Sequence, residues 1–175
     1  EAFRKLGFSV NQTMSVAQRL YESGLITYMR TDSISLSQDA LSTAHAHITK
    51  TYGNDYAETR QFKTKTKGAQ EAHEAIRPTS VSTNYKGDNN QEKRLYELIQ
   101  KRLIASQMAN AKIDRTIVTL SPTDTSQNSE AIVFTAKGEV ITFEGFLKVY
   151  RESYDDDSTP DTRNTGNTDN TQGLP

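Results

Sequence analysis

The chain has 175 residues, of which only 34% are hydrophobic, and its mean hydropathy is −0.73. Ordinary globular domains are about 45–50% apolar with glycine included, so we expect a thin core and surfaces that dock onto something else. The absence of cysteine excludes disulfides, thiolate metal sites and a cysteine nucleophile, and no apolar run approaches the roughly 18 residues of a membrane-spanning helix.

The formal net charge of −1 hides an asymmetry along the chain. Residues 154–175 contain five Asp and one Arg, a net of −4, which leaves +3 for residues 1–153. Mild basicity of the body permits nucleic-acid binding without arguing for it. The Asp run at 155–157 lies in a stretch with almost nothing apolar, which predicts a flexible segment and not a magnesium site. With no signal peptide at its start, the chain is expected to be a soluble intracellular protein or a piece of one.

The N-terminal region predicts helices. Residues 1–6 read as the end of a helix that stops at Gly7. Ser9 and Gln12 have the spacing of a capping box, and a second helix is expected from there to about residue 23. Its apolar positions recur at helical spacing: Val10, Met14, Ala17, Leu20 and Tyr21.

The next stretch alternates between irregular and helical patterns. Residues 25–30 predict a short extended run, and residues 31–37 are rich in turn formers. A helix with a stripe from Leu36 to Ile48 is expected to stop before Gly53. Residues 53–69 are polar, which favours a mobile loop.

A short and a long helix are predicted further on. Residues 71–77 can form about two helical turns, which Pro78 should stop. A polar connection over residues 79–90 leads into the clearest helix, residues 91–108.

The pattern changes to β after Ala111. Residues 113–120, 130–136 and 139–143 are rich in Ile, Val, Thr and Phe. Lys137-Gly138 has the form of a hairpin turn between the last two. Helices followed by a β cluster predict an α+β protein with two lobes.

Tyr28 and Arg30 form the first candidate site. Side chains alternate along an extended segment, so Tyr28 and Arg30 should share a face, together with Asp32 if the extension persists. A nearby cation lowers a tyrosine pKa from about 10, and a guanidinium fits phosphate oxygens. The pair therefore suits nucleophilic attack on a phosphodiester. From spacing alone, however, a Tyr-x-Arg pair on a half-exposed strand is more often non-catalytic than catalytic.

His73 and Arg77 form the second candidate. They are four residues apart, so on a helix they would share one face as a cationic patch for a phosphate or nucleotide. The alternative, favoured by spacing alone, is an ion pair between Glu74 and Arg77 on a solvated surface. His73 is a weak metal candidate, because no second His or carboxylate cluster completes a ligand set.

Two long motifs resemble one family. Residues 24–33 (GLITYMRTDS) resemble the active-site segment of type IA DNA topoisomerases, and residues 70–78 (QEAHEAIRP) resemble a second signature of that family in the same order. Further similarity extends the resemblance to about residues 1–150. Met29, between the tyrosine and the arginine, is typical of the bacterial topoisomerase I branch, whereas topoisomerase III often has proline there.

The resemblance implies a mechanism. Tyr28 would be the nucleophile that holds a 5′-phosphotyrosine ester, and Arg30 would orient and stabilise the scissile phosphate. The released 3′ hydroxyl would reverse the ester after strand passage, so that negative supercoils relax without ATP. The implied DNA-binding residues are Arg30, Thr31, Asp32, His73 and Arg77.

The resemblance also implies a division of the chain. Residues 1–112 would be a mainly helical gate domain with helix-turn-helix-like elements, residues 113–150 part of an antiparallel β arch, and residues 151–175 a flexible acidic tail. Mg²⁺ would be bound by a toprim domain outside this chain, which itself has no metal site. The expected partners are single-stranded DNA and the remaining domains of the same protein, in the cytoplasm at the nucleoid and away from membranes.

Two other functions stay open at this point. The main alternative is a non-catalytic DNA-binding module of winged-helix type, which shares the helices, the later strands and the modest positive charge. The other is a structural arch segment that contacts no nucleic acid. In the topoisomerase interpretation, the chain alone is expected to be inactive, because it has the nucleophile without the acid and metal that assist the leaving group.

Overall fold

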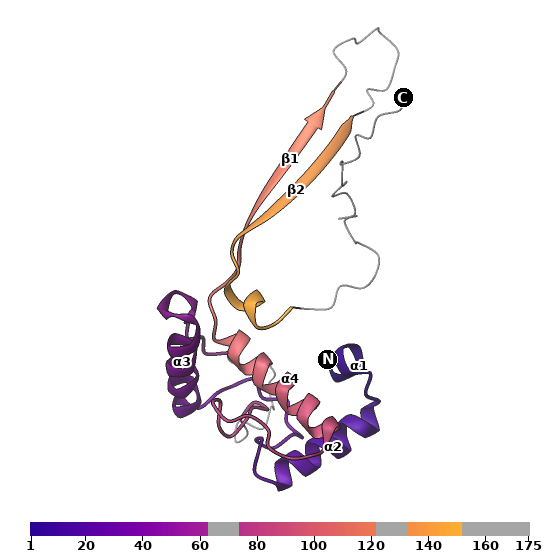
Figure 1. Ribbon diagram of the computed structural model, residues 1–175, viewed down its shortest axis with the longest axis vertical. Helices are drawn as coiled ribbons and strands as arrows, with labels where there is room; N and C mark the ends of the chain where they lie inside the picture. Colours follow the sequence, from indigo (N-terminus) through magenta and orange to yellow (C-terminus); the bar gives the residue numbers. More distant parts are fainter. Residues whose placement is uncertain (63–73, 122–132, 152–175) are drawn as a thin grey trace, which may run out of the picture.

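The computed structural model describes residues 1–62, 74–121 and 133–151, and it confirms an α+β fold. In Figure 1 the helices gather at one end, and the hairpin of β1 and β2 projects away from them. The elements of the described residues, in chain order, are α1 (Ala2–Leu6), α2 (Val10–Glu22), α3 (Gln38–Tyr52), the 3-10 turn η1 (Asn54–Tyr56), α4 (Asn90–Ser106), β1 (Lys112–Leu120), β2 (Phe134–Phe143) and the 3-10 turn η2 (Gly145–Lys148).

Local capping explains why the predicted helices form where they do. The Ser9 hydroxyl accepts a hydrogen bond from the Gln12 amide at 3.2 Å, and Ser37 and Asn89 cap α3 and α4 in the same way. Gly7 ends α1 with a φ of 71°, the left-handed conformation that glycine adopts without strain.

The core is built around α4. Its Leu95 and Tyr96 pack against α2, while Leu103 and Ile104 pack against α3. The buried face of α2 differs from the predicted stripe: its buried residues are Val16, Ala17 and Leu20. Of the positions predicted to face the core, Val10 is 77% exposed and Tyr21 is 40% exposed, because the contact with α4 selects a narrower face.

The hairpin corrects one prediction. β2 runs without a break through Lys137 and Gly138, and Gly138 lies opposite Thr116 in the antiparallel register. Gly138 has no positive φ, which a tight two-residue hairpin turn would require of it. The predicted turn at this position is therefore wrong, and the connection between the strands lies in residues outside the described part.

The predicted mobile loop at 53–69 is also wrong for its described part. Ala57 forms a β-bridge with Met108, and the Arg60 amide donates to the side-chain oxygen of Gln107 at 2.9 Å. Gln107 is a buried polar residue of the core, so its amide fixes this segment against the end of α4. Residues 63–69, and the predicted tail beyond Arg151, lie outside the described residues.

Candidate active site

The two signature segments lie side by side, although about 50 residues separate them in the chain. Ile26 and Pro78 form an antiparallel β-bridge. The Thr27 amide donates to the Arg77 carbonyl at 2.9 Å, and the Thr79 amide donates to the Leu25 carbonyl at 3.0 Å. The backbone thus brings the residues around Tyr28 next to the second signature.

The Thr27 side chain strengthens this junction. Its hydroxyl donates to the Ala75 carbonyl at 2.8 Å and accepts from the Arg77 amide at 2.9 Å. The Ala75 amide in turn donates to the Ser35 carbonyl at 2.8 Å, so the loop after Tyr28 encloses residues 75–77. Sequence reasoning missed Thr27, although a hydroxyl beside a candidate nucleophile is a signal worth weighing.

The predicted extended run over residues 25–30 is interrupted: it forms an isolated bridge at Ile26 and bends at Met29 and Arg30. The Ser33 amide donates to the Thr31 hydroxyl at 3.0 Å, and the Ser35 amide donates to the Ser33 hydroxyl at 3.2 Å. These local bonds occupy amides that a strand would pair with a neighbour. Strand alternation therefore does not place Asp32 on one face with Tyr28 and Arg30.

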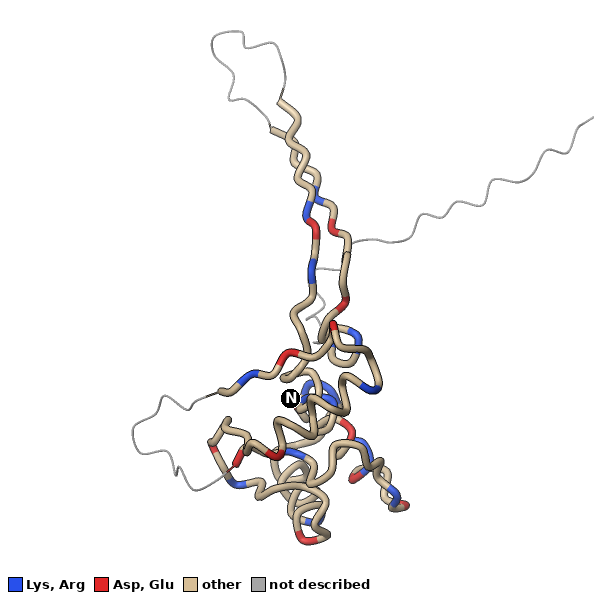
Figure 2. Tube along the Cα trace, turned by 90° about the vertical axis from the view of Figure 1, so that its left-hand side faces the viewer, with Lys and Arg blue, Asp and Glu red and all other residues tan. Residues whose placement is uncertain are grey.

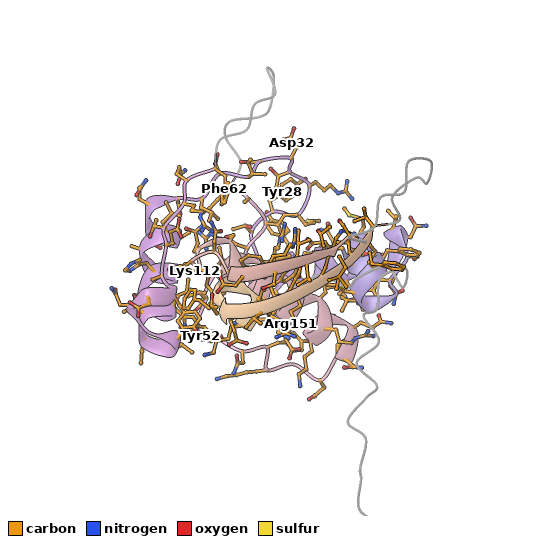
Figure 3. The ribbon with its side chains drawn as sticks, turned by 90° about the horizontal axis from the view of Figure 1, so that it is seen from above. Tyr28, Asp32, Tyr52, Phe62, Lys112 and Arg151 are labelled. Atoms are coloured by element: carbon orange, nitrogen blue, oxygen red, sulfur yellow. The ribbon has the colours of Figure 1, made fainter. Side chains whose placement is uncertain are left out.

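Tyr28 and Arg30 lie on either side of a buried methionine. Met29, between them, is only 6% exposed and belongs to the core with α2 and α4. Tyr28 is half-buried, and its ring meets that of Tyr21 edge-on, with centroids 5.3 Å apart. Arg30 is exposed. Figure 3 shows Tyr28 and Asp32 along the same edge of the molecule, near Phe62.

Arg77 is held by Glu74 in a two-pronged ion pair. Its Nε donates to Glu74 Oε1 at 2.8 Å, and its Nη2 donates to Glu74 Oε2 at 2.9 Å. A third bond runs from Nη1 to the Pro78 carbonyl at 2.9 Å. Three of the five N–H groups of the guanidinium are thus engaged by described residues, and the other two have no partner among them.

Residues 74–77 are not helical, so the helix predicted there is wrong over these positions. Their backbone bonds with Thr27 and Ser35 compete with a helical turn. The ion pair weighed as an alternative does form, but its side chains are only 15% and 24% exposed, in a loop and not on a solvated helix. His73 lies outside the described residues.

Glu74 also joins a third segment, because its Oε1 accepts from the Ser37 amide at 2.8 Å, just ahead of α3. Partial burial opposes ionisation of this carboxyl. The hydrogen bonds from Arg77 and Ser37 outweigh burial and hold the Glu74 pKa below its ordinary value. The carboxylate is therefore charged at neutral pH.

A resident metal does not fit the residues that the structure describes, since no group of three or more His, Asp or Glu side chains among them is placed to hold one. Over the same residues, no helix is both long and apolar enough to cross a membrane.

Comparison with known proteins gives consistent results. A family model described as DNA topoisomerase matches residues 1–172. DNA topoisomerase 1 of Zymomonas mobilis is 50% identical over 160 residues, which cover 90% of this chain and 13% of that protein. DNA topoisomerase 1 of Mycolicibacterium smegmatis is 48% identical over 163 residues, or 89% of this chain and 17% of that protein.

A solved structure agrees in fold. Full-length topoisomerase I from Thermotoga maritima superposes with a TM-score of 0.70 at 36% sequence identity, over 91% of this chain and 26% of that chain. The chain therefore spans about a quarter or less of the relatives that it matches.

Proposed function

Because the chain belongs to the family of bacterial DNA topoisomerases, as the resemblance of its two motifs predicted, we propose that it carries the strand-cleaving tyrosine of a type IA topoisomerase, Tyr28. The observation that supports this most directly is the backbone pairing of Leu25 and Thr27 with Arg77 and Thr79. It brings the second signature against the segment that carries a half-buried tyrosine and an exposed arginine.

The proposed reaction exchanges one phosphate ester for another. The Tyr28 hydroxyl loses its proton and attacks a phosphorus of one DNA strand, and the bond from that phosphorus to the 3′ oxygen breaks. The 3′ oxygen takes up a proton and leaves as a hydroxyl, while the 5′ phosphate stays on Tyr28. The other strand passes through the gap, and the 3′ hydroxyl then reverses the ester. Torsional strain drives relaxation of negative supercoils, so no ATP is needed.

The other proposed site residues bind the strand. Arg30 is exposed beside Tyr28 and would stabilise charge on the non-bridging phosphate oxygens. Within the described residues two N–H groups of Arg77 have no partner, so they would bind a nucleotide, and the pair with Glu74 fixes their direction. The full proposed DNA-binding set is Arg30, Thr31, Asp32, His73 and Arg77.

Other parts of the reaction belong to other domains in this proposal. Residues 1–112 form the gate domain, and residues 113–150 contribute part of the arch. A toprim domain outside this chain would bind Mg²⁺ and supply the acid for the leaving group. We assign no metal-dependent step to the described residues and expect the chain alone to be inactive. The full-length protein is expected to act on DNA of the nucleoid, in the cytoplasm.

Covalent capture tests the proposal. The chain, within its full-length protein, is mixed with a single-stranded oligonucleotide labelled at its 3′ end, and the mixture is denatured. Label should remain attached to protein, and Tyr28→Phe should abolish this attachment because the nucleophile is gone.

Tyr21→Phe is the matched control, since it removes a neighbouring phenol hydroxyl while keeping the ring that packs on Tyr28. Label retained on the Tyr28→Phe protein would show that another residue is the nucleophile. A winged-helix-type module would yield no adduct with either protein.

A further inference from the structure

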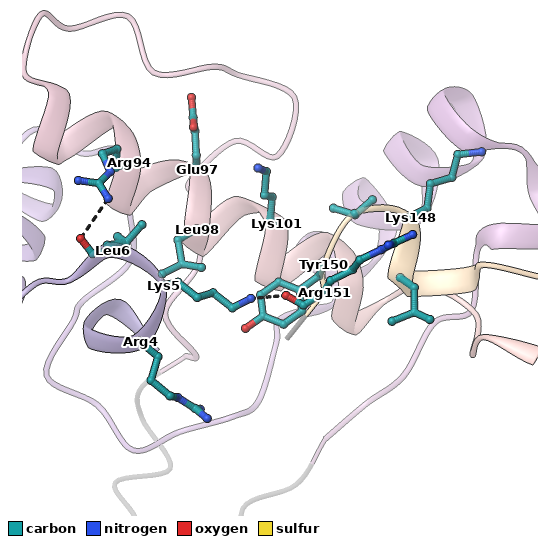
Figure 4. Close-up of a pocket in the computed structure, with 12 residues that line it drawn as sticks. Arg4, Lys5, Leu6, Arg94, Glu97, Leu98, Lys101, Lys148, Tyr150 and Arg151 are labelled. Atoms are coloured by element: carbon teal, nitrogen blue, oxygen red, sulfur yellow. Dashed lines mark hydrogen bonds between the residues drawn. The ribbon is translucent and has the colours of Figure 1, made fainter. Parts of the chain in front are cut away.

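A basic hollow lies between α1, α4 and η2, and none of the described residues that line it belongs to the two signature segments. Its volume is about 740 Å³. Figure 4 shows side chains from these three elements converging on it, and Figure 2 shows basic positions next to the N-terminus, where α1 lies. The cations that line it are Arg4, Lys5, Arg94, Lys101, Lys148 and Arg151.

The hollow concentrates positive charge in a chain that is nearly neutral. Among the described residues, six cations line it against a single carboxylate, Glu97, which gives this lining a formal charge of +5 where the whole chain has −1. Outside the lining, Glu144 lies 3.8 Å from Arg151, at the limit of an ion pair between largely exposed groups. Like charges gathered in this way raise the local concentration of anions.

Three of these cations are held by neutral partners, and one of them, Lys148, donates to the Tyr56 hydroxyl at 3.4 Å. Lys5 donates to the Arg151 carbonyl, and Arg94 donates to the Leu6 carbonyl at 3.0 Å. A carbonyl orients a cationic group without cancelling its charge. The hollow is thus partly organised for an anion before any ligand arrives.

Two other cations of the lining are not held by side-chain interactions within the described residues. Arg4 and Lys101 are exposed, and within the described residues neither makes an ion pair or a side-chain hydrogen bond. Both line the hollow, Arg4 from α1 and Lys101 from α4. Their substitution should therefore change the charge of the hollow and leave the core intact.

The floor of the hollow excludes base stacking. Its aromatic residue, Tyr150, is only 3% exposed, and the Lys5 ammonium lies 4.1 Å from the centre of its ring. Recognition would therefore act through phosphates and not through bases, which makes it independent of sequence. A positively charged groove that follows the backbone is how many proteins bind single strands.

We propose that this hollow, the α1–α4 groove, binds the phosphate backbone of single-stranded DNA at a second site, separate from Tyr28. The inference rests on the proposed function, because that function makes DNA the substrate. A contact away from the nucleophile would hold a strand to the gate domain while its scissile phosphate lies at Tyr28.

Binding of a labelled 12-residue oligothymidylate to the full chain tests this, with fluorescence anisotropy read over a range of salt concentrations. All proteins carry Tyr28→Phe, so no covalent adduct contributes. Replacing Arg4 and Lys101 by Gln should raise Kd about tenfold at low salt and reduce the slope of log K against log salt by about 1.4, since single strands lose roughly 0.7 per phosphate contact.

The matched control replaces Lys50 and Lys93 by Gln. It removes the same charge from exposed helical positions, one of them next to Arg94 on α4, and neither residue lines the groove. Binding should stay within about twofold of the parent, because net charge alone changes little. Equal losses in both double variants, or no loss in the groove variant, would overturn the proposal. Tighter binding of a duplex of the same length than of the single strand would overturn the assignment to single strands.

The two proposals fail in different ways. If covalent capture at Tyr28 fails while the groove variant still loses binding, the chain binds DNA without the proposed chemistry. If capture succeeds while the groove variant binds as tightly as its parent, the second site is wrong and the proposed function stands.

Discussion

Glu74 joins three segments that the chain brings together from far apart. Its carboxylate binds Arg77 through two bonds and accepts the Ser37 amide ahead of α3, while Thr27 ties the same loop to the Tyr28 segment. The spacing of Glu74 and Arg77 predicted their pairing. It could not predict the setting, because the partners that keep these residues out of a helix are about 40–50 positions away in sequence.

Glu74→Gln should destabilise the chain by about 1–3 kcal/mol, because a part-buried guanidinium loses its charged acceptor. The native pKa of Glu74 is lowered below the unfolded value of 4.5, so the carboxylate stabilises the fold fully above pH 4.5. That contribution disappears as pH falls through the lowered native pKa. Urea unfolding should show a larger difference between parent and variant at pH 7 than at pH 3, because the carboxylate's contribution declines as pH falls.

Glu58→Gln is the control for this measurement. Glu58 pairs with Arg60 at 2.9 Å, but its side chain is 51% exposed, so its loss should cost less than about 1 kcal/mol. A Glu74→Gln penalty no larger than that of Glu58→Gln, or one that grows as pH falls from 7 to 3, would contradict the bridging role.

At the scale of elements, the sequence predicted the helices α1 to α4 correctly but not the pairing of the two strands. The sequence predicted the helix capped by Ser9 from its capping box, and it predicted α3 and α4 from their apolar spacing; in the structure Ser37 and Asn89 also cap those helices within three residues of themselves. The course of β2 depends on its register with β1, which local propensity does not contain. Lys137-Gly138 has turn chemistry, yet it lies opposite Ile117 and Thr116 inside a ladder.

Gly138→Thr should therefore stabilise the hairpin by about 0.5–1 kcal/mol, since glycine weakens a strand and threonine favours one. An added Cβ at Gly138 would meet nothing within 4 Å, and its φ is not positive. Amide hydrogen exchange of the β1–β2 bonds measures the effect. Faster exchange of these amides in the variant would instead support a turn at Lys137-Gly138.

Gly24→Ala provides the contrast. A Cβ at Gly24 also meets nothing within 4 Å, but Gly24 has a φ of +68°. Both sites have room for a Cβ, but the positive φ at Gly24 strains any other residue, so alanine there should cost about 1 kcal/mol, measured by urea unfolding.

For the whole molecule, the low hydrophobic content agrees with a hairpin whose strands are almost entirely exposed to solvent in this chain. Every residue of β1 is exposed, and so is β2 up to its last residue. One face of the hairpin is apolar toward its far end, where Val118 lies opposite Ala136 and Leu120 opposite Phe134. An isolated two-stranded hairpin is marginally stable in water, and this chain spans only 13–17% of its curated relatives from Zymomonas and Mycolicibacterium. We infer that other parts of the full-length protein cover this face.

Replacing Leu120 and Phe134 together by Gln tests that inference in two contexts. In the chain alone these side chains are 61% and 66% exposed, so the change should shift the unfolding free energy of the helical part by less than about 0.5 kcal/mol. In the full-length protein the same change should cost about 3–6 kcal/mol, because two large apolar side chains leave a covered surface.

The matched control is the neighbouring pair, Thr119 and Thr135, which lie opposite each other on the other face of the hairpin. Their replacement by Gln should be nearly neutral in both contexts, since that face also carries the exposed Arg115–Glu139 ion pair and suits solvent. Thermal unfolding of the four proteins gives the comparison. A small effect of the Leu120 and Phe134 change in the full-length protein, or an equal effect of the threonine pair, would show that the apolar face stays open to solvent.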